Sequence, residues 1–166
     1  MGEKIPIISE KVYNFEGMFD IKETYSFMLD YIENYMYYDL SEKEYEEKFS
    51  PPSKTIISNI QGEKILNDNF HIIIKLKIEL SGKDTEMEIN GMKKNMTKGS
   101  GKIVLNSYLE PQKNVDPEKS PWGAFLDKVY NKFVGNDEQE KAIIVGAKDV
   151  GEIISRFKQH MNSITK

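Results

Sequence analysis

The chain has 166 residues, of which 23 are basic, 27 are acidic and none is cysteine, so its net charge is −4 and it can form no disulfide, thiolate metal site or cysteine nucleophile. This length favours a single domain over residues 1–166, with a core large enough to fold without cross-links. No apolar run approaches the roughly 20 residues that cross a bilayer, and the N-terminus lacks a signal-peptide pattern, so we expect a cytoplasmic protein without stable membrane insertion.

The first 40 residues predict a strand followed by a helix. Residues 11–15 (KVYNF) have the composition of a short strand. Asp20 and Glu23 then have the spacing of a capping box, which indicates that a helix begins there. Apolar residues recur at three- and four-residue spacings as far as Tyr38, which predicts one buried helical face.

A second helix is predicted directly afterwards. Ser41 and Glu44 repeat the capping-box spacing at the start of a strongly acidic segment. Pro51-Pro52 would end this helix, because proline cannot continue one and restricts the residue before it.

The stretch from residue 54 to residue 110 predicts several antiparallel strands separated by turns. Its longest strand has an apolar side chain at every second position, so one face is wholly apolar. That face consists of Phe70, Ile72, Ile74, Leu76, Ile78 and Leu80. Asn90-Gly91 is typical of a type I′ hairpin turn, and further turns are expected at Gln61-Gly62, Ser81-Gly82 and residues 99–101.

Two helices are predicted after the strands. Residues 112–135 form an insertion with a short amphipathic helix at 122–134, and residues 137–162 have the apolar spacing of one long helix. This long helix contains Gly146 and Gly151, and each glycine costs about 1 kcal/mol relative to alanine. Either a close approach to the sheet or room for a ligand offsets that cost, or the helix breaks and a new one begins at Asp149.

The predicted order is one strand, two helices, a run of antiparallel strands and a long terminal helix, an α+β fold in which a helix grips a curved sheet. This order resembles the START-like or SRPBCC superfamily, the helix-grip fold shared with birch-pollen-type allergens, over nearly the whole chain. The resemblance implies an apolar cavity between the sheet and the terminal helix, which in that superfamily holds lipids, sterols or polyketides. Some members are instead cyclases, hydrolases or protein-binding factors.

The resemblance also assigns candidate ligand contacts. Apolar residues of the strands and of the terminal helix would line the cavity, or would fill its place as a solid core. The residues are Phe70, Ile72, Ile74, Leu76, Ile78, Met87, Leu105, Ile143, Ala147, Val150 and Ile154. We therefore expect the protein to bind a hydrophobic small molecule or lipid, with no cofactor.

Catalytic residues are not evident in the sequence. The two histidines, His71 and His160, have no spaced partner, no metal-ligand pattern occurs, and neither a P-loop nor a nucleophile elbow is found. An enzyme would need polar groups inside the cavity, and the candidates for that role are Tyr25, Tyr35, Ser107 and Tyr108. We expect a binding protein in preference to an enzyme.

A protein-interaction module is the main alternative. Seven of the nine tyrosines lie within residues 13–45, and residues 1–50 hold 12 acidic but only 5 basic side chains. Tyr37 and Tyr38 are adjacent, so at least one should face solvent, where tyrosine is favoured at interfaces. Nucleic acid is not an expected partner, because Arg156 is the only arginine.

Overall fold

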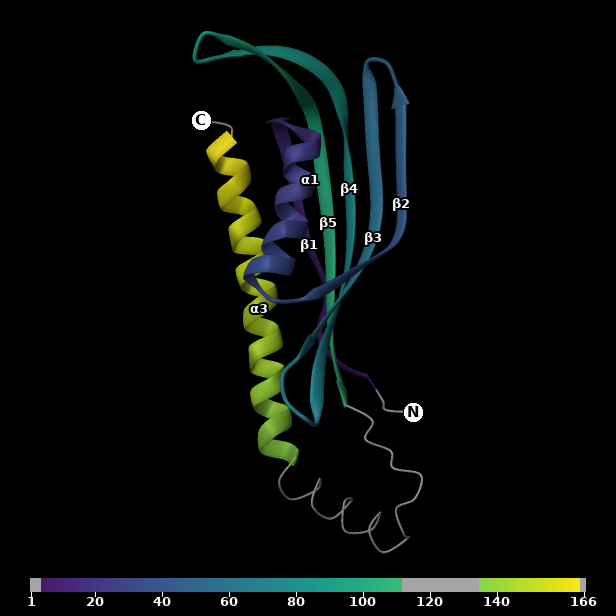
Figure 1. Ribbon diagram of the computed structural model, residues 1–166, viewed down its shortest axis with the longest axis vertical. Coiled ribbons are helices and arrows are strands. Elements are labelled where there is room, and N and C mark those ends of the chain that lie inside the picture. The colour runs from purple at the N-terminus through teal and green to yellow at the C-terminus, as the bar shows by residue number, and fades with distance from the viewer. Residues whose placement is uncertain (1–3, 112–134, 165–166) are drawn as a thin grey trace, which may run out of the picture.

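The computed structural model describes residues 4–111 and 135–164. Figure 1 shows one antiparallel sheet with α1 and α3 on the same face, so the predicted α+β class is confirmed. The elements are β1 (Ile5–Phe19), α1 (Ile21–Asp30), the π-helical turn η1 (Tyr31–Tyr35), β2 (Asp39–Ser50), β3 (Ser53–Ile65), β4 (Phe70–Ile89), β5 (Met92–Pro111) and α3 (Gly135–Ile164). The five strands are ordered β1-β5-β4-β3-β2. The helix predicted at 122–134 lies outside the described residues.

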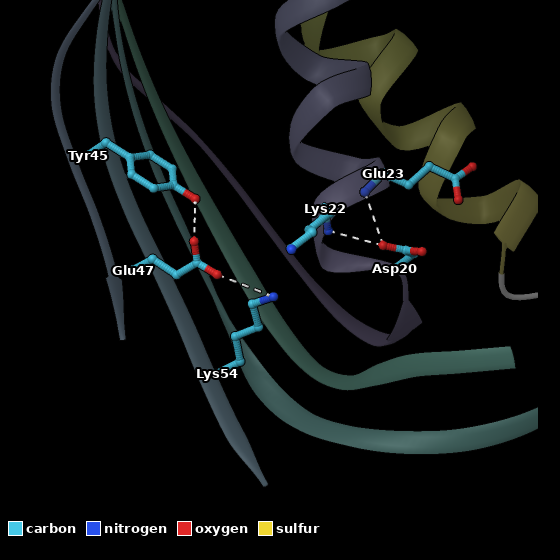
Figure 2. Close-up of polar contacts among 6 residues, drawn as sticks. All are labelled: Asp20, Lys22, Glu23, Tyr45, Glu47 and Lys54. Carbon is cyan, nitrogen blue, oxygen red and sulfur yellow. Dashed lines mark hydrogen bonds and ion pairs between the residues drawn. The ribbon is translucent and has the colours of Figure 1, made fainter. Parts of the chain in front are cut away.

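The start of the first helix is as predicted. The Asp20 carboxylate accepts hydrogen bonds from the backbone N–H groups of Lys22 and Glu23, both at 3.1 Å, and so satisfies two donors that have no partner within the helix (Figure 2). The helix continues through η1 and ends before Tyr37, whose positive φ of 65° turns the chain toward β2.

The prediction of a second helix at 41–50 is wrong, because this segment is strand β2. It pairs with β3 in antiparallel register, from Asp39 opposite Glu63 to Ser50 opposite Ser53. Figure 2 shows two polar contacts of Glu47: the Tyr45 hydroxyl of the same strand donates to its carboxylate, and the Lys54 ammonium of β3 lies 3.3 Å from that carboxylate and joins the two strands. Both contacts lower the pKa of Glu47. Pairing with β3 therefore overrides the local capping-box pattern.

Three predicted turns are also wrong, because the strands run through them. β3 passes Gly62 and ends at Ile65, and β4 and β5 are each continuous on both sides of the Gly82–Gly99 pair. A Cβ at Gly62 would lie 2.8 Å from Ile74 Cγ1, and one at Gly82 would lie 2.6 Å from the carbonyl oxygen of Lys98. These glycines permit close approach within the sheet and are not turn residues.

The turn predicted at Asn90-Gly91 is confirmed. Both residues have positive φ, 52° and 79°, as a type I′ turn requires. The hairpin of β4 and β5 bends over one end of the two helices (Figure 1), and Lys94 forms an ion pair with Glu23 of α1 across this contact.

The edge strands β1 and β2 both carry register shifts. In β1 the shifts lie between Pro6 and Lys11, and in β2 one residue, Lys43, is inserted between Glu42 and Glu44. Such bulges interrupt the regular edge to which another strand could pair.

The terminal helix is one continuous element, so the break considered at residue 149 does not occur. A Cβ at Gly146 would lie 2.5 Å from Ile7 Cδ1, whereas one at Gly151 would have no atom within 4 Å. Close approach to β1 therefore accounts for the first glycine and not for the second. Within residues 4–111 and 135–164, no helix has the length and apolarity needed to cross a membrane.

Candidate functional site

The residues predicted to contact a ligand lie mostly in one packed core. Those from Phe70 to Ile78 in β4, together with Leu105, Val150 and Ile154, are at most 8% exposed. Ile143 and Ala147 are half-buried, and Ile143 packs against the core. Met87 lies apart, in the distal part of β4, where its backbone pairs with Lys94. The sheet face that the sequence predicts to be apolar thus contributes buried side chains to the interior.

A groove with aromatic walls lies between the two helical segments, on the surface of this core. It consists of two adjoining hollows of about 280 and 230 Å³, which share Arg156 and Gln159. The first is also lined by Tyr31, Tyr35, Glu152 and Ser155, and the second by Phe27, His160 and Ser163. We refer to both hollows together as the aromatic groove.

Helical spacing explains why these residues gather. Phe27, Tyr31 and Tyr35 are four residues apart, so they lie on one face of α1 and η1. The residues from α3 recur every three or four positions between 152 and 163, which places them on one face of that helix. Figure 1 shows α1 running alongside α3, so the aromatic face and the polar face form opposite walls.

Four rings follow one another in a row that begins with His160 of α3 and continues along the aromatic face of α1 and η1. His160 stacks on Phe27 with centroids 3.9 Å apart, Phe27 is 6.2 Å from Tyr31, and Tyr31 is 5.1 Å from Tyr35. The planes differ by 7° to 18°, so the rings are nearly parallel. Tyr35 closes the row and is 70% exposed. Its ring is therefore accessible for stacking by another planar group.

The opposite wall carries charge and hydrogen-bonding groups. The Arg156 guanidinium lies 5.8 Å from the centroid of the Tyr31 ring and donates a hydrogen bond to Gln159 at 3.1 Å. Burial, followed by the nearby Glu152 carboxylate, raises the pKa of Tyr31, so this hydroxyl stays protonated at neutral pH. The groove can accept a planar apolar group on one side and bind a polar or anionic substituent on the other.

His160 adds a neutral nitrogen base to the groove. Burial lowers its pKa, and Arg156 acts in the same direction while Glu23 opposes it. Its Nε2 atom has no hydrogen-bond partner among the described residues. The ring is thus uncharged near neutral pH, and its unpaired Nε2 atom is buried.

The tyrosine pair predicted as a docking surface is divided by the structure. Tyr37 is 77% exposed, whereas Tyr38 is only 1% exposed and donates a hydrogen bond to Asp149 at 2.8 Å. Lys64 also binds Asp149, at 3.0 Å. Burial, strengthened by the Asp149 carboxylate, raises the pKa of Tyr38. Tyr38, Lys64 and Asp149, which we call the Asp149 cluster, join β3 and the link between η1 and β2 to α3.

The polar side chains considered for catalysis do not come together. Tyr25 hydrogen-bonds Glu42 and Ser58, and burial raises its pKa. Ser107 is fully buried, and its hydroxyl has no hydrogen-bond partner among the described residues. Tyr108 lies under the Lys75 ammonium on the other face of the sheet. In the described part of the chain, no group of three or more His, Asp or Glu side chains is arranged to hold a metal ion.

The polar wall of the groove was not found by reasoning from the sequence. Arg156, Gln159 and Ser163 are spaced along one face of a predicted helix, and this spacing could have indicated a polar wall. The same spacing is also typical of a helix face exposed to solvent. No protein-family model matches this chain, and no curated protein matches it either. The antiparallel sheet and the long terminal helix are compatible with a helix-grip architecture.

Proposed function

We propose that this protein binds a small aromatic molecule, mostly apolar and bearing one anionic or hydrogen-bonding group, in the aromatic groove. The observation that supports the proposal is the row of four nearly parallel rings that ends at the exposed Tyr35, beside the only arginine of the chain. A ligand ring would extend this row, and Arg156 would bind the polar substituent.

The size of the groove fits this class of ligand. Its larger hollow, about 280 Å³, is close to the lower end of the range of small-molecule sites, roughly 300 Å³. That volume suits a ligand of one or two fused rings. A long lipid chain would need additional space, which the packed side chains of the inner sheet face would have to vacate.

This proposal modifies what the resemblance to helix-grip proteins implies. In the START-like superfamily the ligand lies between the sheet and the terminal helix, where this chain has buried core residues such as Ile74, Leu105 and Val150. We place the ligand outside this core, in the aromatic groove between α1 and α3. Membership of that superfamily is part of the proposal, supported by the antiparallel sheet and the long terminal helix.

The test uses 8-anilinonaphthalene-1-sulfonate, a fluorescent molecule with fused rings and one anionic group. We expect the unmodified protein to bind it saturably. Tyr35→Ser should weaken binding about two- to tenfold, because an aromatic pair contributes about 0.5–1.5 kcal/mol. Arg156→Gln should weaken it about fivefold, because a partly exposed cation contributes about 1 kcal/mol.

Tyr37→Ser is the matched control for these variants. Tyr37 is as exposed as Tyr35 but does not line the groove, so its replacement should leave the affinity for the dye unchanged. Circular dichroism would establish that each variant is folded. Equal affinities for the Tyr35 and Tyr37 variants would refute the proposed position of the ligand.

A protein-interaction role is the second candidate, because Tyr37 has a large exposed ring on a backbone of positive φ. If a protein partner docks there, Tyr37→Ser should remove it from affinity-purified material while dye binding stays unchanged. A partner that is lost in the Tyr35 variant and retained in the Tyr37 variant would contradict this role for Tyr37.

A further inference from the structure

The outer face of the sheet, opposite the two helices, carries a second hollow that the aromatic groove does not involve. Its volume is about 340 Å³, and it extends over β2, β3, β4 and β5. Lys43, Lys75 and Lys77 supply three ammonium groups, and Asn59, Gln61 and Asn106 supply three amides. We refer to it as the lysine hollow.

The register of the sheet places these residues side by side. Lys75 of β4 lies between Gln61 of β3 and Asn106 of β5, and Lys77 lies opposite Asn59. Because side chains alternate along a strand, Lys75 and Lys77 face away from the core that contains Leu76. The row of Gln61, Lys75 and Asn106 and the neighbouring row of Asn59 and Lys77 therefore form one polar surface.

The bulge in β2 accounts for the third lysine. Lys43 is the residue inserted between Glu42, which faces Ile60, and Glu44, which faces Asn59. A bulge redirects the side chain of the extra residue, and bulges are over-represented beside functional sites. Here the extra residue lines the hollow, so it brings a cation from the edge strand toward those of β4.

The charges of the hollow are only partly compensated. Lys77 forms an ion pair with Glu79 at 3.3 Å, and Asn59 donates a hydrogen bond to Glu44 at 3.2 Å. Lys43 and Lys75 form no ion pair with any described residue, and Lys75 lies 5.6 Å from the centroid of the Tyr108 ring. Two lysines without an ion pair among the described residues thus line a hollow that also has amide side chains, within a protein that is acidic overall.

From this arrangement we propose that the lysine hollow binds a small molecule with two or more anionic groups, either phosphate or carboxylate. Lys43 and Lys75 would contact separate anionic groups from opposite sides of the hollow. Gln61 and Asn106, which flank Lys75, would donate hydrogen bonds to the same ligand through their amides. The proposal is independent of the aromatic groove.

Isothermal titration calorimetry with inorganic pyrophosphate and, separately, with citrate tests this site. Saturable binding of pyrophosphate alone supports a phosphate ligand, saturable binding of citrate alone supports a carboxylate ligand, and binding of both supports the shared chemistry. Binding should weaken as salt is added, because exposed charges are screened. Absence of saturable binding for both anions would overturn the proposal.

Variants locate the site. Lys43→Gln and Lys75→Gln should each weaken binding about fivefold, because an exposed ion pair contributes up to about 1 kcal/mol. Lys48→Gln is the matched control, since Lys48 also lies on β2 but pairs with Glu46 away from the hollow. An equal loss in all three variants would indicate nonspecific attraction and overturn the proposal.

Nuclear magnetic resonance gives a readout that needs no variant. In the unmodified protein, the side-chain amide signals of Gln61 and Asn106 should shift on titration with the anion that binds. Unchanged amide signals in the presence of a saturating anion would place that anion elsewhere and overturn the assignment.

Discussion

The Asp149 cluster predicts a large and non-additive loss of stability when its contacts are removed. Tyr38, Lys64 and Asp149 lie far apart in the sequence. The Tyr38 hydroxyl and the Lys64 ammonium bind the same carboxylate oxygen of Asp149. Because Tyr38 is almost fully buried, water cannot replace its hydrogen bond when the partner is removed. The cluster thus fixes α3 to the strand end that carries Lys64.

The expected magnitudes follow from burial. Tyr38→Phe removes one hydrogen bond to a charged acceptor and leaves the ring in place, so the free energy of unfolding should fall by about 2 kcal/mol. Asp149→Ala also leaves the Lys64 ammonium without its partner. We expect a loss of about 3 kcal/mol, the low end for a broken buried pair, because the Lys64 side chain is 22% exposed and can extend toward water.

The assay is urea unfolding followed by circular dichroism, with unchanged slope as the condition for comparing free energies. The double variant Tyr38→Phe/Asp149→Ala should lose about 1–2 kcal/mol less than the sum of the single losses, since both changes remove one shared hydrogen bond. Tyr35→Phe, at an exposed tyrosine, is the control and should change stability by less than about 0.5 kcal/mol. Strict additivity, or single losses no larger than the control, would refute the reasoning.

Three further predictions concern stability. Gly151→Ala should stabilise the protein by about 1 kcal/mol, because a Cβ there meets no atom and alanine favours a helix. Gly146→Val should destabilise it by about 1–3 kcal/mol, because the larger side chain would collide with Ile7. If urea unfolding ranks the two variants in the opposite order, the packing of α3 described here is contradicted. Gly91→Ala should cost about 1–2 kcal/mol, because φ is 79° in the hairpin turn, and an unchanged melting temperature would count against that turn. The lowered pKa of His160 means that the unfolded state binds its proton more readily, so stability should fall as pH decreases through about 6.5 and His160→Gln should flatten this dependence; identical pH profiles for the two proteins would rule out the effect.

The sequence predicted the elements whose local and long-range preferences agree. The alternation from Phe70 to Leu80, the Asp20 cap and the Asn90-Gly91 turn all match the structure. In each case the pattern depends on a few neighbouring residues, and the surrounding fold agrees with it. The long terminal helix belongs to the same group, since its apolar spacing continues across both glycines.

The errors occurred where contacts with a neighbouring strand decide the conformation. β2 has the composition of a solvated helix, and only its register with β3 makes it a strand. Gly82 and Gly99 resemble turn residues when read separately, but they lie opposite each other and allow two backbones to approach closely. Local composition cannot distinguish these cases, because the deciding contacts lie on another strand.

The candidate site was predictable only in part. The strand residues from Phe70 to Ile78 and Leu105, which were assigned to a ligand cavity, lie on one face of the sheet as predicted, and in the structure they are packed core residues. Tyr35 was considered as an isolated cavity group, whereas it closes a row of stacked rings opposite Arg156. That arrangement depends on how α1 crosses α3, which the separate helical patterns do not specify.

The most direct test of the proposed function is a nuclear magnetic resonance titration of the isotope-labelled protein with 8-anilinonaphthalene-1-sulfonate. Our account predicts saturable shifts for Tyr31, Tyr35, Arg156 and Gln159, with little change at Lys75 on the opposite face of the sheet. Shifts confined to the lysine hollow would show that the sulfonate alone directs binding. That result, or shifts confined to the buried core, would contradict a ligand site between α1 and α3.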